Sequence, residues 1–138
     1  MLKALTAAGL GLILIAAPAA AQNPTGGALV AAQLDAAVNE LGLTPGARVT
    51  GRLAQNGSRL HNVQAPGGMT YFIGVCDENC DDLDLVVRDA AGREIGRDVE
   101  IDDVPMVGAE IVAGTYTVEV SMAGCNSQCH WGVGVFRP

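Results

Sequence analysis

The sequence contains very little positive charge. Its 138 residues carry eight lysines and arginines against fifteen aspartates and glutamates, which gives a formal net charge of −7. Lys3 is the only lysine, so the chain from Gln22 onward has seven arginines and a formal charge of −8. Nucleic acids and anionic membranes are bound by basic patches that displace counterions. We therefore expect neither of them as a partner.

Aromatic residues are also scarce, and the motifs of common catalytic sites are missing. No serine lies in a Gly-x-Ser-x-Gly context, which nucleophilic hydrolases use. Cys129 and His130 are adjacent, and neighbouring side chains of a strand point to opposite faces. We predict no catalytic residue and no enzyme activity. A sugar cleft with aromatic platforms is disfavoured too, because the chain has five aromatic residues and most of them fit a core: Tyr71, Phe72, Tyr116, Trp131 and Phe136.

One long hydrophobic segment is present, and it lies at the N-terminus. Lys3 precedes an apolar run from Leu10 to Ala17, and Pro18 then leads into three alanines that end at Ala21. This order is typical of a cleavable signal peptide, and the run is shorter than the ~20 residues of a transmembrane helix. We predict a signal peptide over residues 1–21, no membrane insertion after its cleavage, and a periplasmic or secreted mature protein.

The four cysteines form two Cys-x-x-x-Cys pairs, Cys76 with Cys80 and Cys125 with Cys129. An even number of cysteines in an exported chain indicates disulfides, whereas zinc sites usually use Cys-x-x-Cys. Each pair falls between two predicted strands, so we expect the cysteines at the tips of β-hairpins. Closing a local loop by a disulfide stabilises the fold by about 2 kcal/mol, and a bridge from Cys76 to Cys129 would stabilise it by about 4 kcal/mol. We favour the two local pairs, with cross-linked hairpins as the alternative.

Residues 22–45 are predicted to form a flexible leader and one amphipathic helix. Gly42 is placed to end this helix, and Pro45 prevents its continuation. The helix is expected over residues 28–41, where apolar side chains recur three or four residues apart: Val30, Leu34, Ala37, Val38 and Leu41.

From residue 46 to 138 the apolar pattern changes to a period of two, which indicates β-strands. Strands are predicted near residues 48–53, 69–75, 83–87, 93–95, 115–122 and 131–135, separated by turns rich in Gly, Pro and Asn. Such a pattern is typical of an antiparallel sandwich or barrel. The alternation predicts these core residues: Leu85, Val87, Tyr116, Val118, Val120, Trp131 and Val133.

Two segments resemble a known family. Residues 80–92 read Cys-Asp-Asp-Leu-Asp-Leu-Val-Val-Arg-Asp-Ala-Ala-Gly, and residues 113–120 read Ala-Gly-Thr-Tyr-Thr-Val-Glu-Val. They are similar, in order and spacing, to the D-L-D-L-x-V-x-D-x-x-G and a-G-T-Y-t-v-x-V segments of bacterial pre-peptidase C-terminal domains. The similarity extends over residues 49–136. It implies a jelly-roll-like β-sandwich that binds rather than catalyses. The paired cysteines are not part of that family's pattern, which suggests a stand-alone exported form.

Acidic residues are concentrated in one part of the chain, since eleven of the fifteen lie between Asp77 and Asp103. Clustered carboxylates are the ligands that Ca²⁺ prefers, so calcium is the one cofactor that the sequence suggests. No EF-hand spacing is present. The alternative is a solvated acidic edge, partly balanced by arginines. The candidate calcium ligands are Asp77, Asp81, Asp82, Asp84, Asp102 and Asp103.

Two functions agree with these observations. The first is an exported, non-catalytic binding module for a protein or polysaccharide of the cell envelope or the extracellular space, assisted by calcium. The second is a small periplasmic inhibitor or accessory subunit of a secreted hydrolase or peptidase, whose disulfide-clamped loops enter the partner's cleft.

Overall fold

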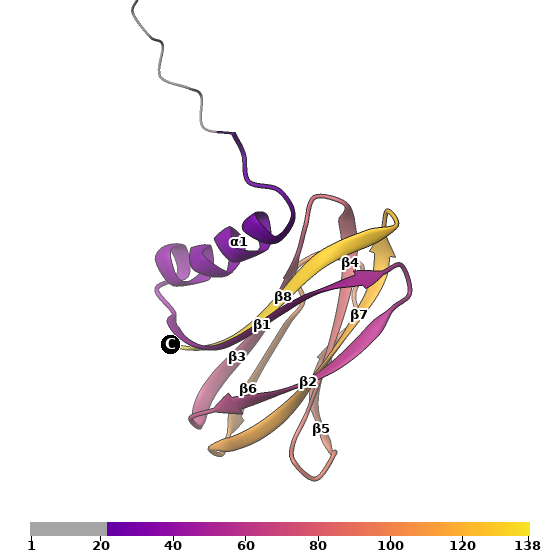
Figure 1. The fold of residues 1–138 in the computed structure, drawn as a ribbon. Helices are drawn as coiled ribbons and strands as arrows, with labels where there is room; N and C mark the ends of the chain where they lie inside the picture. The colour runs from indigo at the N-terminus through magenta and orange to yellow at the C-terminus, as the bar shows by residue number, and fades with distance from the viewer. Residues whose placement is uncertain (1–21) are drawn as a thin grey trace, which may run out of the picture.

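The chain folds into one helix packed on two antiparallel β-sheets (Figure 1). The computed structural model describes residues 22–138, so the predicted signal peptide lies outside the described residues. Strands make up most of this part of the chain. The elements are α1 (Gly26–Leu41), β1 (Thr44–Ala54), β2 (Ser58–Ala65), β3 (Gly68–Cys76), β4 (Cys80–Arg88), β5 (Glu94–Asp98), β6 (Met106–Ile111), β7 (Gly114–Cys125) and β8 (Gln128–Arg137).

The strand order is that of a jelly roll. One sheet, called sheet A here, has the order β1-β8-β3-β6, and the other, sheet B, has the order β2-β7-β4-β5. Every strand pairing is antiparallel. Successive strands mostly alternate between the sheets, so their connections gather at the two ends of the sandwich. The predicted fold class, a mainly β jelly-roll-like sandwich with one N-terminal helix, is confirmed.

The core lies between the two sheets, where alternate side chains of each strand point inward. In β7 the inward set is Tyr116, Val118, Val120 and Met122, which are all buried. The seven core residues predicted from the alternation are buried as well. The period-two pattern was therefore sufficient to find the core face of β4, β7 and β8.

Helix α1 covers the outer face of sheet A over β8 and β3 (Figure 1). Val30 and Leu34 are buried there, because glycines of β8 allow the helix backbone to approach closely. A Cβ atom at Gly132 would lie 2.6 Å from Cγ1 of Val30. The helix begins two residues before the predicted start and ends, as predicted, at Gly42, whose φ is 68°. No helix among residues 22–138 is long and apolar enough to cross a membrane.

The predicted hairpin positions of the cysteines need a correction. β3 belongs to sheet A and β4 to sheet B, and β7 and β8 are likewise on opposite sheets. Each Cys-x-x-x-Cys segment therefore crosses from one sheet to the other at a corner of the sandwich. Alternation along a strand shows which face is buried, but it does not show which strand is the lateral neighbour. The sequence patterns also gave no strand for residues 58–65, which form β2.

Candidate functional site

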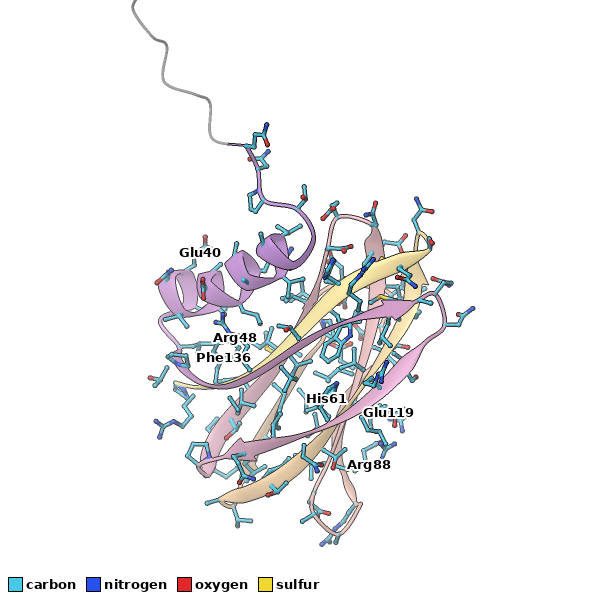
Figure 2. All side chains as sticks on the ribbon, in the orientation of Figure 1. Glu40, Arg48, His61, Arg88, Glu119 and Phe136 are labelled. Atoms are coloured by element: carbon cyan, nitrogen blue, oxygen red, sulfur yellow. A yellow bond between two sulfur atoms is a disulfide. The ribbon has the colours of Figure 1, made fainter. Side chains whose placement is uncertain are left out.

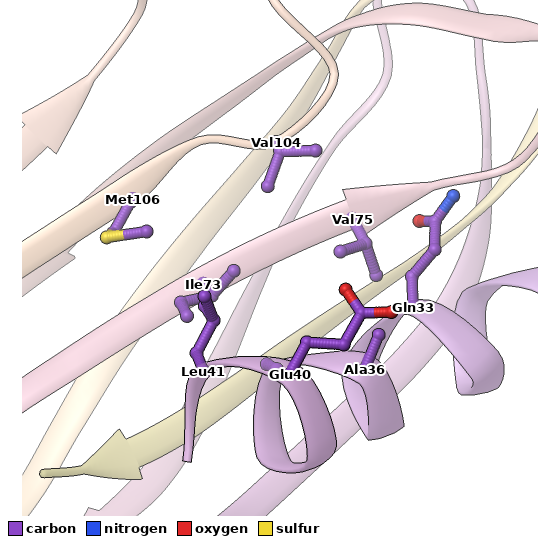
Figure 3. Close-up of a pocket in the computed structure, with 9 residues that line it drawn as sticks. Gln33, Ala36, Glu40, Leu41, Ile73, Val75, Val104 and Met106 are labelled. Atoms are coloured by element: carbon purple, nitrogen blue, oxygen red, sulfur yellow. The ribbon is translucent and has the colours of Figure 1, made fainter. Parts of the chain in front are cut away.

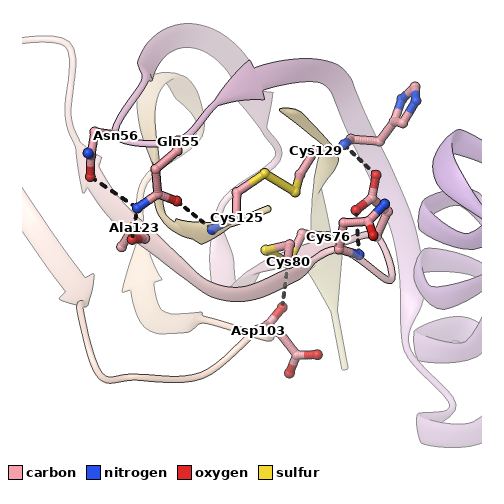
Figure 4. The surroundings of a disulfide bond; sticks show 11 residues. Gln55, Asn56, Cys76, Cys80, Asp103, Ala123, Cys125 and Cys129 are labelled. Atoms are coloured by element: carbon pink, nitrogen blue, oxygen red, sulfur yellow. Dashed lines mark hydrogen bonds between the residues drawn. A yellow bond between two sulfur atoms is a disulfide. The ribbon is translucent and has the colours of Figure 1, made fainter. Parts of the chain in front are cut away.

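Three of the crossings between the sheets come together at one end of the sandwich, which we call the disulfide end. They are the connections β1–β2 (residues 55–57), β3–β4 (residues 77–79) and β7–β8 (residues 126–127). The structure pairs Cys76 with Cys80 and Cys125 with Cys129, so both local bridges lie here (Figure 4). Cys80 and Cys125 are also register partners of β4 and β7. The two disulfides are therefore next to each other and close two of the three crossings.

Hydrogen bonds join the three crossings to one another. Gln55 donates through its main-chain N–H to the Ser127 carbonyl at 2.9 Å and through Nε2 to the Ala123 carbonyl at 2.9 Å. Its Oε1 accepts from the N–H of Cys125 (Figure 4). The N–H of Asn126 donates to the Asn79 carbonyl at 2.9 Å. The disulfide end is thus one connected surface rather than three independent loops.

The tips of two crossings adopt a backbone conformation that is rare for residues other than glycine. Asn56 has a φ of 65° and Ser127 a φ of 82°, and these are the two such residues in the described chain. Residues held in this region are found in turns and at functional sites, where the surrounding structure determines them. Here the disulfides and the bonds of Gln55 hold both tips in place.

Asp77 organises the β3–β4 crossing from inside. Its side chain is buried, and its two oxygens accept from the N–H groups of Asn79 at 3.0 Å and His130 at 2.7 Å. The next residue, Glu78, accepts from the N–H of Gly26 at 2.8 Å and so satisfies one free donor at the start of α1. Two acids of this segment therefore anchor the loop and the helix.

Figure 4 also marks the approach of Cys76 Sγ to the carbonyl oxygen of Asp103, at 3.7 Å. The sulfur is part of a disulfide and has no proton to donate, so this is a packing contact. It places the connection between β5 and β6 (residues 99–105) beside the disulfide end. A main-chain bond from Leu83 to the Asp102 carbonyl, 2.9 Å long, ties the same connection to β4.

Beside this connection the structure gathers five carboxylates, which we call the acidic edge: Asp82, Asp84, Asp98, Glu100 and Asp102. Oxygens of Asp98, Glu100 and Asp102 lie within 4.8 Å of one another. One oxygen each of Asp82 and Asp84 is buried without a hydrogen-bond partner. Burial of Asp84, together with the nearby charges of Asp82, Asp98 and Asp102, raises the pKa of its carboxyl group.

The six predicted calcium ligands are therefore separated into two groups. Asp82, Asp84 and Asp102 lie in the acidic edge, whereas Asp77 binds main-chain groups and Asp81 and Asp103 are exposed. Sequence reasoning missed Asp98 and Glu100. The alternation of acids at positions 98, 100 and 102 was the signal that could have identified them.

Serine and histidine side chains, which serve as nucleophile and base in many hydrolases, have structural partners in this fold. Ser58 Oγ lies 2.8 Å from Ser121 Oγ, and the His61 ring lies 5.1 Å from the Trp131 ring. Within residues 22–138, no hydrogen bond joins a serine to a histidine. On the outer face of sheet B, Arg88 pairs with Glu119 at 2.8 Å (Figure 2).

Comparisons with known proteins find similarity to solved structures but to no family model. No family model matches the chain, so its resemblance to pre-peptidase C-terminal domains stays a prediction, and no curated protein matches either. The crystal structure of Aeromonas hydrophila PliG, a periplasmic inhibitor of g-type lysozyme, is similar to it. The two chains share 15% sequence identity, with a TM-score of 0.45 over 66% of this chain and 85% of PliG. At this level the functional proposal depends on this chain's own residues.

Proposed function

We propose that this chain is an exported, non-catalytic protein that binds in the cleft of a cationic secreted hydrolase and inhibits it. The observation that carries the proposal is the disulfide end, where three crossings form one cross-linked surface. A surface held in its binding conformation loses little entropy when it docks, so more of the contact energy becomes affinity. Disulfides are also the means by which small exported domains keep loops rigid.

The charge distribution supports a cationic partner. Among the described residues, four arginines form ion pairs, and none of these pairs includes a carboxylate of the acidic edge. The acidic edge therefore retains its negative charge next to the disulfide end. Such a field accelerates encounter with a positively charged protein.

A protein partner is favoured over a polysaccharide by the position of the aromatic residues. Phe72, Tyr116, Trp131 and Phe136 are buried in the core, and Tyr71 is half-buried below α1. These rings pack inside the fold and do not form an exposed platform for a sugar. The exposed side chains of the disulfide end are polar and uncharged or acidic: Asn56, Glu78, Asn79, Asn126, Ser127 and Gln128.

The proposal is tested with purified mature protein and a panel of cationic secreted hydrolases that includes a g-type lysozyme and a peptidase. We expect stoichiometric inhibition of at least one enzyme. In Asn126→Trp a bulky ring replaces an exposed side chain of the disulfide end, and binding should weaken at least about tenfold, which corresponds to about 1.4 kcal/mol.

The matched control is Ala90→Trp, which places the same ring on the exposed β4–β5 turn at the opposite end of the sandwich. This variant should inhibit as well as the unmodified protein. Equal loss in both variants would show that the disulfide end is not the docking surface. Failure to inhibit any enzyme of the panel would contradict the proposed function.

A further inference from the structure

A second surface, between α1 and β6, has the features of a binding groove. Most of the large apolar side chains exposed among the described residues belong to three segments: the C-terminus of α1, the start of β6 and the connection before it. They are Leu41, Val99, Ile101, Val104 and Met106. Contiguous exposed apolar side chains on a soluble protein usually mark an interaction site.

Three of them, Leu41, Val104 and Met106, border an open groove of about 300 Å³ between α1 and sheet A (Figure 3). Its floor is formed by Ile73 and Val75 of β3, and Leu41, Val104 and Met106 form its walls. We call it the α1–β6 groove. A second hollow shares Leu41 and Met106 and continues past Leu43, Tyr71 and Pro138. Together they form an apolar channel beside β6.

β6 is an edge strand of sheet A. It pairs with β3 alone among the strands of residues 22–138. The N–H of Met106 bonds to Asp98 Oδ2 at 2.9 Å, which shows that this residue turns its main chain away from β3. Main-chain groups of an antiparallel strand alternate in direction, so Gly108 and Glu110 also face outward. Gly108 has only main-chain atoms and is exposed.

The charges around this edge are negative. Glu40 lies at the groove, Glu110 lies on β6, and the acidic edge begins next to Met106. Neither hollow is lined by an arginine. A second copy of this chain would bring acidic edges together, which repel one another. An extended segment with apolar and basic residues in alternation is complementary to the edge in charge and in apolar surface.

We propose that β6 and the α1–β6 groove bind an extended segment of a cationic protein by strand addition. The main chain of the segment pairs with Gly108 and Glu110, alternate apolar side chains occupy the groove, and the basic side chains between them face the acidic edge. Strand addition takes affinity from main-chain bonds and specificity from alternate side chains. The groove borders the β5–β6 connection beside the disulfide end, but Gly108 and Glu110 lie outside the three crossings. The proposal therefore does not require the function proposed above.

The test uses an acetylated and amidated peptide of alternating arginine and valine, eight residues long, with ¹⁵N-labelled mature protein. The amide resonances of Gly108 and Glu110 should shift on titration, and those of Asn56 and Ser127 at the disulfide end should not. N-methylation of alternate peptide bonds removes the pairing donors and should weaken binding at least about tenfold. A peptide with glutamate in place of arginine should not bind.

A matched pair of variants tests the groove. Leu41→Glu should weaken peptide binding at least about tenfold, and Leu60→Glu on β2 should leave it unchanged. The two leucines form a matched pair because their exposure is nearly the same, 63% for Leu41 and 61% for Leu60. Equal binding by Leu41→Glu, shifts confined to other residues, or no binding at all would overturn the proposal. Concentration-dependent shifts of Gly108 without peptide would identify a second copy as the occupant and would overturn it as well.

Discussion

Replacement of Asp77 by alanine is expected to destabilise the fold and loosen the disulfide end. The side chain is 4% exposed and accepts from the N–H groups of Asn79 and His130. When a buried N–H group loses its acceptor, the free energy of unfolding falls by about 1–3 kcal/mol. Two such donors, with some access of water to the loop, should lower the free energy of unfolding by about 2–4 kcal/mol.

Urea unfolding measures this loss through Trp131, the only tryptophan of the chain, which is 1% exposed and so reports on the core. For a domain of this size, 1 kcal/mol corresponds to about 3–6 °C in the thermal midpoint. The control is Asp81→Ala, which removes an exposed acid of the same segment. Its effect should stay within about 0.5 kcal/mol, as for other surface sites.

The same experiment distinguishes the loop-anchoring role of Asp77 from the predicted role in binding calcium. As an anchor, Asp77 contributes equally in calcium and in chelator, so the loss in Asp77→Ala should be the same in both. A calcium ligand would contribute only when the ion is present. A loss below about 0.5 kcal/mol in chelator would therefore refute the reasoning, because it would show that both N–H groups find other partners.

Four further predictions follow from the packing and the charges. Serine at both Cys125 and Cys129 should lower the free energy of unfolding by about 2 kcal/mol, as loop closure predicts, and thiol titration of the unreduced, unfolded parent protein should read near zero. Gly132→Ala should destabilise by about 1–3 kcal/mol, because the new methyl group meets Val30; an unchanged midpoint would show that α1 shifts freely. In chelator at pH 7, Asp84→Asn should raise the midpoint of thermal unfolding. The pKa of Asp84 is raised in the folded protein, which means that ionisation of this carboxyl group destabilises the fold. That gain should vanish as the pH falls below about 4, where the carboxyl is protonated in both states, and a gain that persists there would contradict the cause. Calcium at ten times its dissociation constant should stabilise the parent protein by about 1.4 kcal/mol, and magnesium should stabilise it by less. Equal shifts of the unfolding midpoint with both ions, or no shift with either, would show that the acidic edge is a solvated surface and not a calcium site.

The disulfide pairing was predictable from the sequence, but the arrangement of the two disulfides was not. The exported context and the short spacing predicted the two bridges that the structure contains. A local bridge needs little more than proximity along the chain, so sequence separation was enough to choose it. Cys80 and Cys125 are register partners across β4 and β7, and nothing in the spacing of the cysteines indicated that.

The candidate site was predictable only in part. Asp82, Asp84 and Asp102 were identified because acids are dense in this segment, but density does not separate a ligand from an anchor. Asp77 lies in the same run and is buried against main-chain donors of its own crossing and of β8. Gln55 was missed entirely, because a single glutamine in a turn has no distinguishing pattern until its partners are known.

The sequence by itself determined the faces of the strands, the helix and its end at Gly42, and the excess of negative charge. These properties depend on residue type and on a period of two or three to four, which act over a few neighbours. Only the tertiary structure decided which strands are neighbours, which crossings meet at the disulfide end, and which acids share the acidic edge. Those relations join residues far apart in the chain, as Gln55 and Cys125 are and as the register partners Thr44 and Arg137 are. They arise when two sheets bury a common core.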